Sequence, residues 1–167
     1  EIFSVLQQIA GMVGCAEKGA TLLADMHTRL QAIADAAARL PRRPKIYFEE
    51  WDEPAISAIQ WVSELMGIAG GADCFPELAT QRLGKQRIIA DRDEIVRRNP
   101  DIIIGSWCGK KFRHEKVAAR EGWQTVSAVR DHELHEIKSA NILQPGPAAL
   151  TDGVAQLHDI IVQWSHR

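Results

Sequence analysis

The stretch that decides the fold is KIYFEEWDEP, residues 45–54. Its β-branched and aromatic run is typical of a buried strand. The run ends in an indole and several acids, at the place where an α/β domain presents its strand ends to a ligand. The stretch DIIIGSWCG, residues 101–109, repeats the pattern of a buried strand that stops at a tryptophan. Two strands that each deliver a Trp to one edge of a sheet predict a site for a large flat or apolar ligand.

Around these two stretches the chain alternates between helical and extended patterns. Before the first strand, apolar residues at steps of three and four predict one long helix over 17–40, which prolines end. The other predicted elements are helices at about 2–14, 55–69, 91–98, 113–121 and 147–164, and strands at 45–50, 101–106 and 133–137. This alternation predicts a three-layer α/β/α lobe with a small, mainly parallel sheet, preceded by a long helix.

Composition narrows the class of protein. The 167 residues carry a formal net charge of −2, which gives no electrostatic footprint for DNA or RNA, so we expect no nucleic-acid partner. No apolar run approaches the roughly 18 residues of a membrane span. Cys15, Cys74 and Cys108 show no paired spacing, so we expect no disulfide framework. The chain begins at Glu1 without an initiator Met or a secretion signal. We interpret it as a fragment or processed product, which leaves the compartment open, the cytoplasm included.

Trp51 and Trp107 are the main candidate binding residues, because aromatic faces bury a large area at modest entropic cost. We expect the two rings to lie side by side at neighbouring strand ends and to stack on a ring or macrocycle. The alternative is that one or both cap the core of the sheet.

Four acids surround Trp51, and carboxylates can bind a cation or perform acid–base chemistry. Alternation along a strand places Glu49 and Glu50 on opposite faces, which argues against a catalytic pair. The alternative for these acids is a solvated loop. A small metal- or thiol-dependent enzyme that uses Cys108, Glu50 or Asp52 stays a competing hypothesis, although no base lies near Cys108 in the sequence.

Other motifs for metals and phosphates are weak or missing. His132 and His135 have HExH rather than HExxH spacing and would face opposite ways on a strand, so we expect no metal site. Glycine-rich phosphate loops are missing. The turn QPGP, residues 144–147, leads into the last helix, whose free N–H groups can hold an anion. A rigid turn before a proline-initiated helix is the alternative.

Taken in order, these pieces resemble the cobalamin/iron-siderophore class of substrate-binding proteins of ABC importers. The stretch DRDEIVRRNPDIII, residues 91–104, is similar to the helix, Asn-Pro-Asp turn and strand of that family. The helix and Gly-Gly pair of residues 61–71, followed by Asp-Cys-Phe at 73–75, are also similar. The segments EEWDEP, SWCGK and LQPGPAALTDG resemble the cobalamin-binding branch in particular.

The resemblance implies two lobes joined by a long rigid helix, with the ligand in the cleft between them. Residues 1–44 then hold N-terminal helices that include the interlobe helix, and residues 45–167 form the C-terminal lobe. The resemblance further implies that the N-terminal lobe is absent from this chain and that half of the pocket is missing with it. We then expect that an artificial dimer can form through the exposed cleft face.

The implied function is non-catalytic capture of a cobalamin-like corrinoid and its delivery to a membrane permease, with no intrinsic cofactor. A ferric siderophore or haem is the alternative ligand. The implied location is periplasmic, or extracellular and membrane-anchored.

The resemblance also implies site residues. The expected ligand-binding residues are Glu50, Trp51, Asp52, Arg87, Trp107, Cys108, Asn141 and Gln144. For anionic siderophores, the basic candidates are Arg87 and Lys110. The acid that docks onto permease arginines falls on Asp93, with Glu94 beside it. Relatives usually carry Glu at this position, so the shorter Asp93 is a departure.

Overall fold

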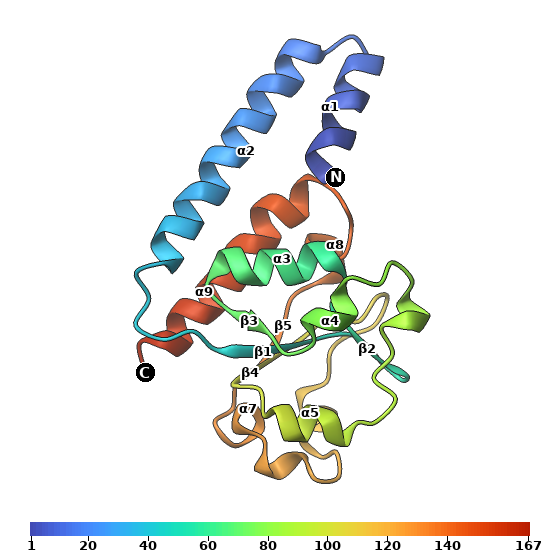
Figure 1. The fold of residues 1–167 in the computed structure, drawn as a ribbon, viewed down its shortest axis with the longest axis vertical. Coiled ribbons are helices and arrows are strands. Elements are labelled where there is room, and N and C mark those ends of the chain that lie inside the picture. Colours follow the sequence, from blue (N-terminus) through green and yellow to red (C-terminus); the bar gives the residue numbers. More distant parts are fainter.

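A five-stranded sheet lies at the centre of the computed structural model, which describes residues 1–167 (Figure 1). The strands are β1 (Lys45–Asp52), β2 (Ala55–Ser57), β3 (Ala72–Asp73), β4 (Ile102–Gly105) and β5 (Leu134–Glu136). Their order is β2-β1-β4-β5, and β3 also pairs with β1. The β1–β3, β1–β4 and β4–β5 pairs are parallel, and β2 is antiparallel to β1. The carboxyl ends of β1, β4 and β5 therefore meet at one edge.

Helices cover both faces of this sheet. The helices are α1 (Ile2–Met12), α2 (Ala16–Ala37), α3 (Gln60–Ala69), α4 (Pro76–Ala79), α5 (Asp93–Arg98), α6 (His114–Ala118), α7 (Ser127–Arg130), α8 (Ser139–Ile142) and α9 (Val154–Ser165). A π-helical turn, Ala149–Gly153, precedes α9. In Figure 1, α2, α3 and α9 lie on one side of the sheet and α5 and α7 on the other.

Two hydrophobic cores follow from the alternation of side chains along the strands. Ile46 and Phe48 of β1 join the core that α2, α3 and α9 cover. Tyr47, between them, joins the second core, which includes residues of α5, α6 and α7. The all-apolar sequence of β4 matches this arrangement, because a strand covered on both faces needs apolar residues at every position. The predicted three-layer α/β/α lobe is thus confirmed.

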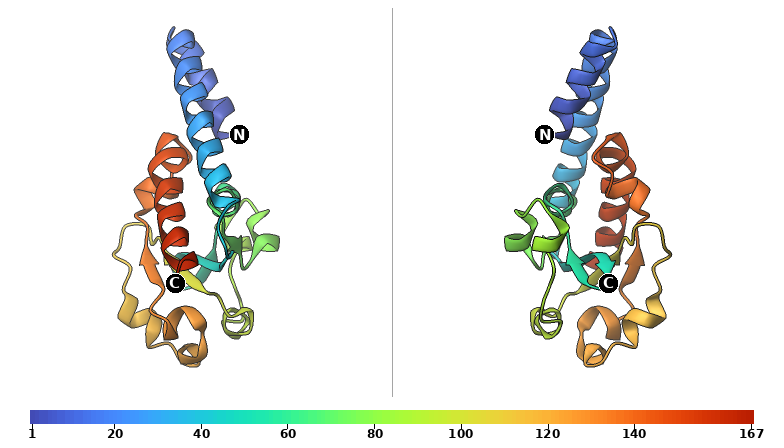
Figure 2. Two further views of the ribbon diagram at one scale, coloured as in Figure 1. Left: turned by 90° about the vertical axis from the view of Figure 1, so that its left-hand side faces the viewer. Right: turned by 90° about the vertical axis from the view of Figure 1, so that its right-hand side faces the viewer.

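The long helix α2 and the preceding α1 project beyond the sheet as an antiparallel pair (Figures 1 and 2). Leu23, Met26 and Leu30 recur at steps of three and four and are the buried residues of α2. Several large apolar side chains of this pair stay exposed, namely Val5, Ile9, Met12, Val13 and Leu22. At 1.5 Å per residue, the 22 residues of α2 extend about 33 Å. No helix of the structure combines the length and the apolar character that crossing a membrane requires.

The Asn-Pro-Asp turn ties α5 to the sheet. Asn99 ends α5 in the left-handed region, with φ of 45°. Its side-chain Oδ1 accepts a hydrogen bond from the backbone N–H of Ser127 at 2.8 Å. Asp101 Oδ2 accepts one from the backbone N–H of Lys45 at 2.7 Å, at the start of β1. The turn therefore fixes α5, α7 and β1 relative to one another.

Several predicted boundaries are wrong. The helix predicted over 55–69 begins only at Gln60, because residues 55–57 pair with β1 as β2. Strand β3 is not among the predicted elements. The helix predicted over 113–121 covers only His114–Ala118, and the one predicted over 147–164 starts with the π-helical turn.

Candidate functional site

Trp51 lies at the carboxyl end of β1, beside a lysine of the loop that follows β4. Glu50 has no partner in the β1–β2 ladder, so the strand bulges there and the bulge sets the direction of Trp51. The Trp51 ring is half-buried, and its Nε1–H donates to the Glu53 carbonyl at 2.8 Å. The Nζ of Lys110 lies 4.1 Å from the Trp51 ring centroid and 5.0 Å from that of Trp107. The structure thus brings both indoles together around one ammonium group.

Trp107 forms part of the core beneath this ammonium group. Only 4% of the residue is exposed, and its ring packs edge-on against Phe112 with centroids 4.9 Å apart. Its Nε1–H donates to Glu49 Oε1 at 3.0 Å. The alternative of a core-capping residue therefore describes Trp107, whereas Trp51 keeps accessible surface.

Glu49 is the centre of a buried polar network that sequence reasoning missed. Its side chain is fully buried, and its carboxylate accepts two hydrogen bonds from Arg120, at 2.6 and 2.9 Å. The Tyr47 hydroxyl donates to the same carboxylate at 2.9 Å. Burial acts to lower the pKa of Arg120, but the hydrogen bonds and charge of Glu49 outweigh it and raise that pKa. Burial, aided by Glu49, raises the pKa of Tyr47. Arg120 lies 71 positions from Glu49, so no local sequence signal links them.

Glu50 pairs with a different arginine, as the predicted opposite directions of Glu49 and Glu50 require. Arg87 Nη1 donates to Glu50 Oε2 at 2.6 Å and to the Ser57 carbonyl at 2.5 Å. Only 2% of Arg87 is exposed, and its Nε has no hydrogen-bond partner. The role of Arg87 as a ligand contact stays a prediction; the structure shows its guanidinium paired with Glu50.

Asp52 completes the exposed group around Trp51. Its carboxylate accepts a hydrogen bond from Lys110 Nζ, and its carbonyl accepts one from Arg92 at 2.9 Å. Partial burial acts to raise the pKa of Asp52, but the Lys110 contact outweighs it, so the pKa is lowered. Cys108 is exposed in the same loop.

The remaining predicted ligand residues follow β5. Asn141 is half-buried in α8, and Gln144 is exposed in the turn after it. Neither side chain forms a hydrogen bond with the residues around Trp51, and their role in ligand binding stays a prediction. His135 contacts Glu133 at 2.8 Å, while His132 is exposed, and no cluster of His, Cys, Asp or Glu is arranged to hold a metal ion.

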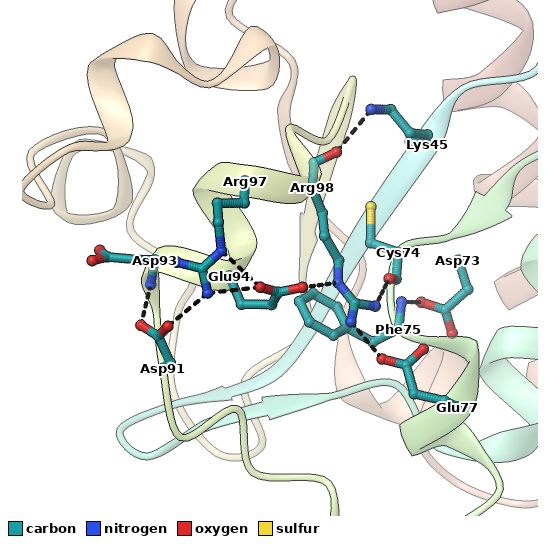
Figure 3. Close-up of polar contacts among 10 residues, drawn as sticks. All are labelled: Lys45, Asp73, Cys74, Phe75, Glu77, Asp91, Asp93, Glu94, Arg97 and Arg98. Carbon is teal, nitrogen blue, oxygen red and sulfur yellow. Dashed lines mark hydrogen bonds and ion pairs between the residues drawn. The ribbon is translucent and has the colours of Figure 1, made fainter.

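A second candidate region is the acidic start of α5, which Figure 3 shows in detail. Arg97 pairs with Asp91 and Glu94, each at 2.7 Å, and Arg98 pairs with Glu94 at 2.8 Å. Asp93 is exposed, forms no ion pair, and points away from both arginines (Figure 3). Of the two acids predicted to dock onto a permease, Asp93 is therefore the one with a free carboxylate.

The ion pairs of α5 pack against an aromatic ring. The Arg98 guanidinium lies 4.1 Å over the Phe75 ring, and a second branch of the network reaches Glu77 at 2.7 Å. Beside it runs a groove of about 280 Å³, lined by apolar residues that include Leu78 and Ile89 and by charged residues of the ion-pair network. This packing holds α5 in place beneath Asp93.

Comparison with known proteins finds binding proteins of transporters. The chain is 22% identical over 171 residues to the uncharacterized ABC transporter substrate-binding lipoprotein YvrC of Bacillus subtilis (strain 168), with 96% of this chain and 50% of YvrC covered. It superposes on the periplasmic vitamin B12 binding protein BtuF of Vibrio cholerae with a TM-score of 0.73 at 19% identity, covering 99% of this chain and 63% of BtuF. For IsdE of S. aureus complexed with heme, the TM-score is 0.76 at 17% identity, with 95% and 63% covered. The chain spans about half the length of the curated relative it matches.

A family model described as periplasmic binding protein matches residues 1–140. The match confirms the resemblance found in the sequence. Because this is a family of transport binding proteins and not of enzymes, the alternative of a metal- or thiol-dependent enzyme is wrong. With most of its length covered by the match, the chain belongs to the periplasmic binding protein family.

Proposed function

We propose that the chain is the C-terminal lobe, with the interlobe helix, of the substrate-binding component of an ABC importer. The observation that carries the proposal is the accessible indole of Trp51 at the carboxyl edge of the parallel sheet, the edge where α/β sheets bind ligands. Membership of the periplasmic binding protein family and the similarity to YvrC support it.

In this proposal, residues 1–44 hold the interlobe helix α2 and residues 45–167 form the C-terminal lobe. Support comes from α1 and α2, whose exposed apolar side chains offer a surface for another lobe. Coverage of only 63% of BtuF agrees with a further lobe in relatives. An isolated lobe would self-associate through its exposed cleft face, and light scattering would detect the resulting dimer.

The first candidate ligand is a cobalamin-like corrinoid, with a ferric siderophore or haem as the alternative. Glu50, Asp52, Cys108 and Lys110 would surround the ligand together with Trp51. Trp107 would act from below by supporting Lys110, whose positive charge is the observation that favours an anionic ligand. The similarity to BtuF, which binds vitamin B12, and to IsdE, which holds heme, agrees with this range of ligands. No cofactor is needed for capture alone.

The ligand proposal is tested by titrating the full-length protein with cyanocobalamin, haemin and a ferric siderophore while following tryptophan fluorescence. Loss of the Trp51 ring in Trp51→Leu should weaken binding by about 1–3 kcal/mol, because a stacked aromatic ring buries apolar area. Trp164→Leu, which changes a half-buried indole beneath Arg42, is the matched control. Equal losses in both variants would contradict a ligand face at Trp51.

The proposed partner is the membrane permease of the importer. Arginines of the permease would pair with the free carboxylate of Asp93. The proposed location is therefore the periplasm, or the outer face of the membrane for a lipid-anchored form like YvrC. In reconstituted vesicles, Asp93→Asn should lower ligand-driven transport, whereas Glu94→Gln should lower it less. The reverse order would show that Glu94 makes the contact.

A further inference from the structure

The exposed indole at the ligand edge is already covered by a cation of the same chain. Lys110 Nζ lies 4.1 Å from the centroid of Trp51 and hydrogen-bonds to the Asp52 carboxylate. An ammonium group at this distance over an aromatic face is a cation–π contact. A ring that stacked on this face of Trp51 would need the space that the ammonium group fills.

The backbone that carries Lys110 is anchored on both sides. Trp107 and Phe112 are buried and pack against each other, and the backbone N–H of Phe112 donates to Glu136 Oε1 at 3.2 Å. Between these anchors Lys110 lies in a short turn over residues 108–111. Its side chain is 40% exposed, and four flexible bonds let the ammonium group move off the indole.

Among the cations near Trp51, Lys110 is the one whose carboxylate partner a ligand can replace. Arg120 is committed to the buried Glu49, and Arg87 to Glu50. Arg92 donates to the carbonyl of Asp52 rather than to its carboxylate. Lys110 instead pairs with the Asp52 carboxylate near the surface, and the carboxylate of an incoming ligand can take the place of Asp52 as its partner.

We propose that Lys110 selects among the candidate ligands by occupying the stacking position, so that the site favours haem, a macrocycle with carboxylates at its rim, over a cobalamin-like corrinoid, whose rim amides are uncharged. This inference rests on the proposed function and specifies the substrate class of the same site. An uncharged ring must displace the ammonium group from both the indole and Asp52 without replacing either contact. A rim carboxylate gives the displaced ammonium group a new charge-assisted hydrogen bond, which offsets that loss.

The test compares two ligands that differ only in their carboxylates, haemin and haemin dimethyl ester. Affinities are measured from the Soret band with the wild-type chain and with Lys110→Met, which keeps length but removes charge. Lys111→Met is the matched control, because Lys111 is exposed next to Lys110 and forms no ion pair. We expect Lys110→Met to lower the ratio of haemin affinity to ester affinity about ten- to a hundredfold, the usual effect of a hydrogen bond to a charged group. Binding of the ester should stay unchanged or tighten, and Lys111→Met should change neither ligand.

Equal weakening of haemin and its ester in Lys110→Met would show a merely structural effect and overturn the inference, as would no change at all. In both cases the proposed function stands, since the wild type still binds a ring. If the wild type binds neither porphyrin nor cyanocobalamin, the proposed function fails and the inference fails with it.

A second measurement uses small quenchers and needs no macrocycle. The Trp51 signal is the difference between each protein and its Trp51→Phe counterpart. In Lys110→Ala, quenching of that signal by iodide should fall, because the nearby positive charge is gone. Quenching by neutral acrylamide should rise, because the indole face is uncovered. Unchanged quenching by both would show that Lys110 does not cover Trp51 in solution, and would overturn the inference.

Discussion

Two groups of carboxylates and arginines in this lobe use the same chemistry in opposite surroundings. At the end of β1, Glu49 is fully buried and takes two hydrogen bonds from Arg120. At the start of α5, the preceding Asp91 and the helical Glu94 both pair with Arg97 at the surface. The buried pair fixes Trp107 beneath the carboxyl edge of the sheet, because Glu49 also accepts a hydrogen bond from the Trp107 indole. The surface pairs stabilise little, but they occupy Glu94 and leave Asp93 free.

The largest effect is expected from breaking the buried pair. Arg120→Met leaves the Glu49 carboxylate without its compensating charge, and such a loss typically destabilises a protein by about 3–5 kcal/mol. The measurement is the free energy of unfolding in urea, read by circular dichroism.

The double variant Glu49→Gln/Arg120→Met is the control, because it removes both charges of that pair. It should be more stable than Arg120→Met alone, since no unpaired charge remains buried. If Arg120→Met unfolds at the wild-type urea concentration, the distinction between buried and surface pairs fails.

A smaller loss of stability is expected at Gly105, where β4 packs tightly against Phe112. A Cβ added at Gly105, the last residue of β4, would overlap the ring of Phe112. Gly105→Ala should therefore destabilise the fold by about 1–3 kcal/mol, the usual range for an overpacked core. Gly146→Ala has open space around its Cβ and serves as the control. Equal urea midpoints for the two variants would mean that Phe112 moves aside freely.

The next prediction compares the reactivity of the buried thiol with that of the exposed thiols. Burial raises the pKa of Cys74 to about 12, while Cys15 and Cys108 are exposed. The folded state favours the protonated thiol, so this contribution to stability is complete below about pH 8.5 and is lost as the pH rises towards 12. Iodoacetamide at pH 8.5 should modify Cys15 and Cys108 and spare Cys74, as read by peptide mass spectrometry. Rapid labelling of Cys74 in the folded protein would contradict its burial.

The smallest effect is expected on α5. Arg97→Met breaks exposed ion pairs with Asp91 and Glu94, and surface pairs of this kind contribute little because water and salt screen them. Its urea midpoint should match that of the wild type within error. A loss comparable to that of Arg120→Met would show that the α5 network is a structural element in its own right.

Sequence patterns predicted the elements with strong periodicity. The apolar run of β4 and the three- and four-residue steps of α2 are signals that a single stretch carries by itself. The hairpin of β1 with β2 was missed because Ala55–Ser57 is only three residues long and reads as the first turn of a helix. Strand β3, with two residues, is too short to show any alternation.

The site was predictable only in part. That Trp51 and Trp107 lie at neighbouring strand ends follows from two similar stretches in a parallel sheet. The burial of Trp107 does not, because it depends on Glu49, Arg120 and Phe112, which only the folded chain brings together. The commitment of Arg87 to Glu50 likewise joins residues 37 positions apart.

Fluorine NMR of the chain labelled with 5-fluorotryptophan tests the role of Trp51 most directly, because each of the five indoles gives its own resonance. Single Trp→Phe variants assign the signals, and haemin dimethyl ester, cyanocobalamin or haemin is then added. We expect the Trp51 resonance to shift most, that of Trp107 to shift less, and that of Trp164 to stay in place. Binding that leaves the Trp51 resonance unmoved would contradict a ligand face at the carboxyl end of β1.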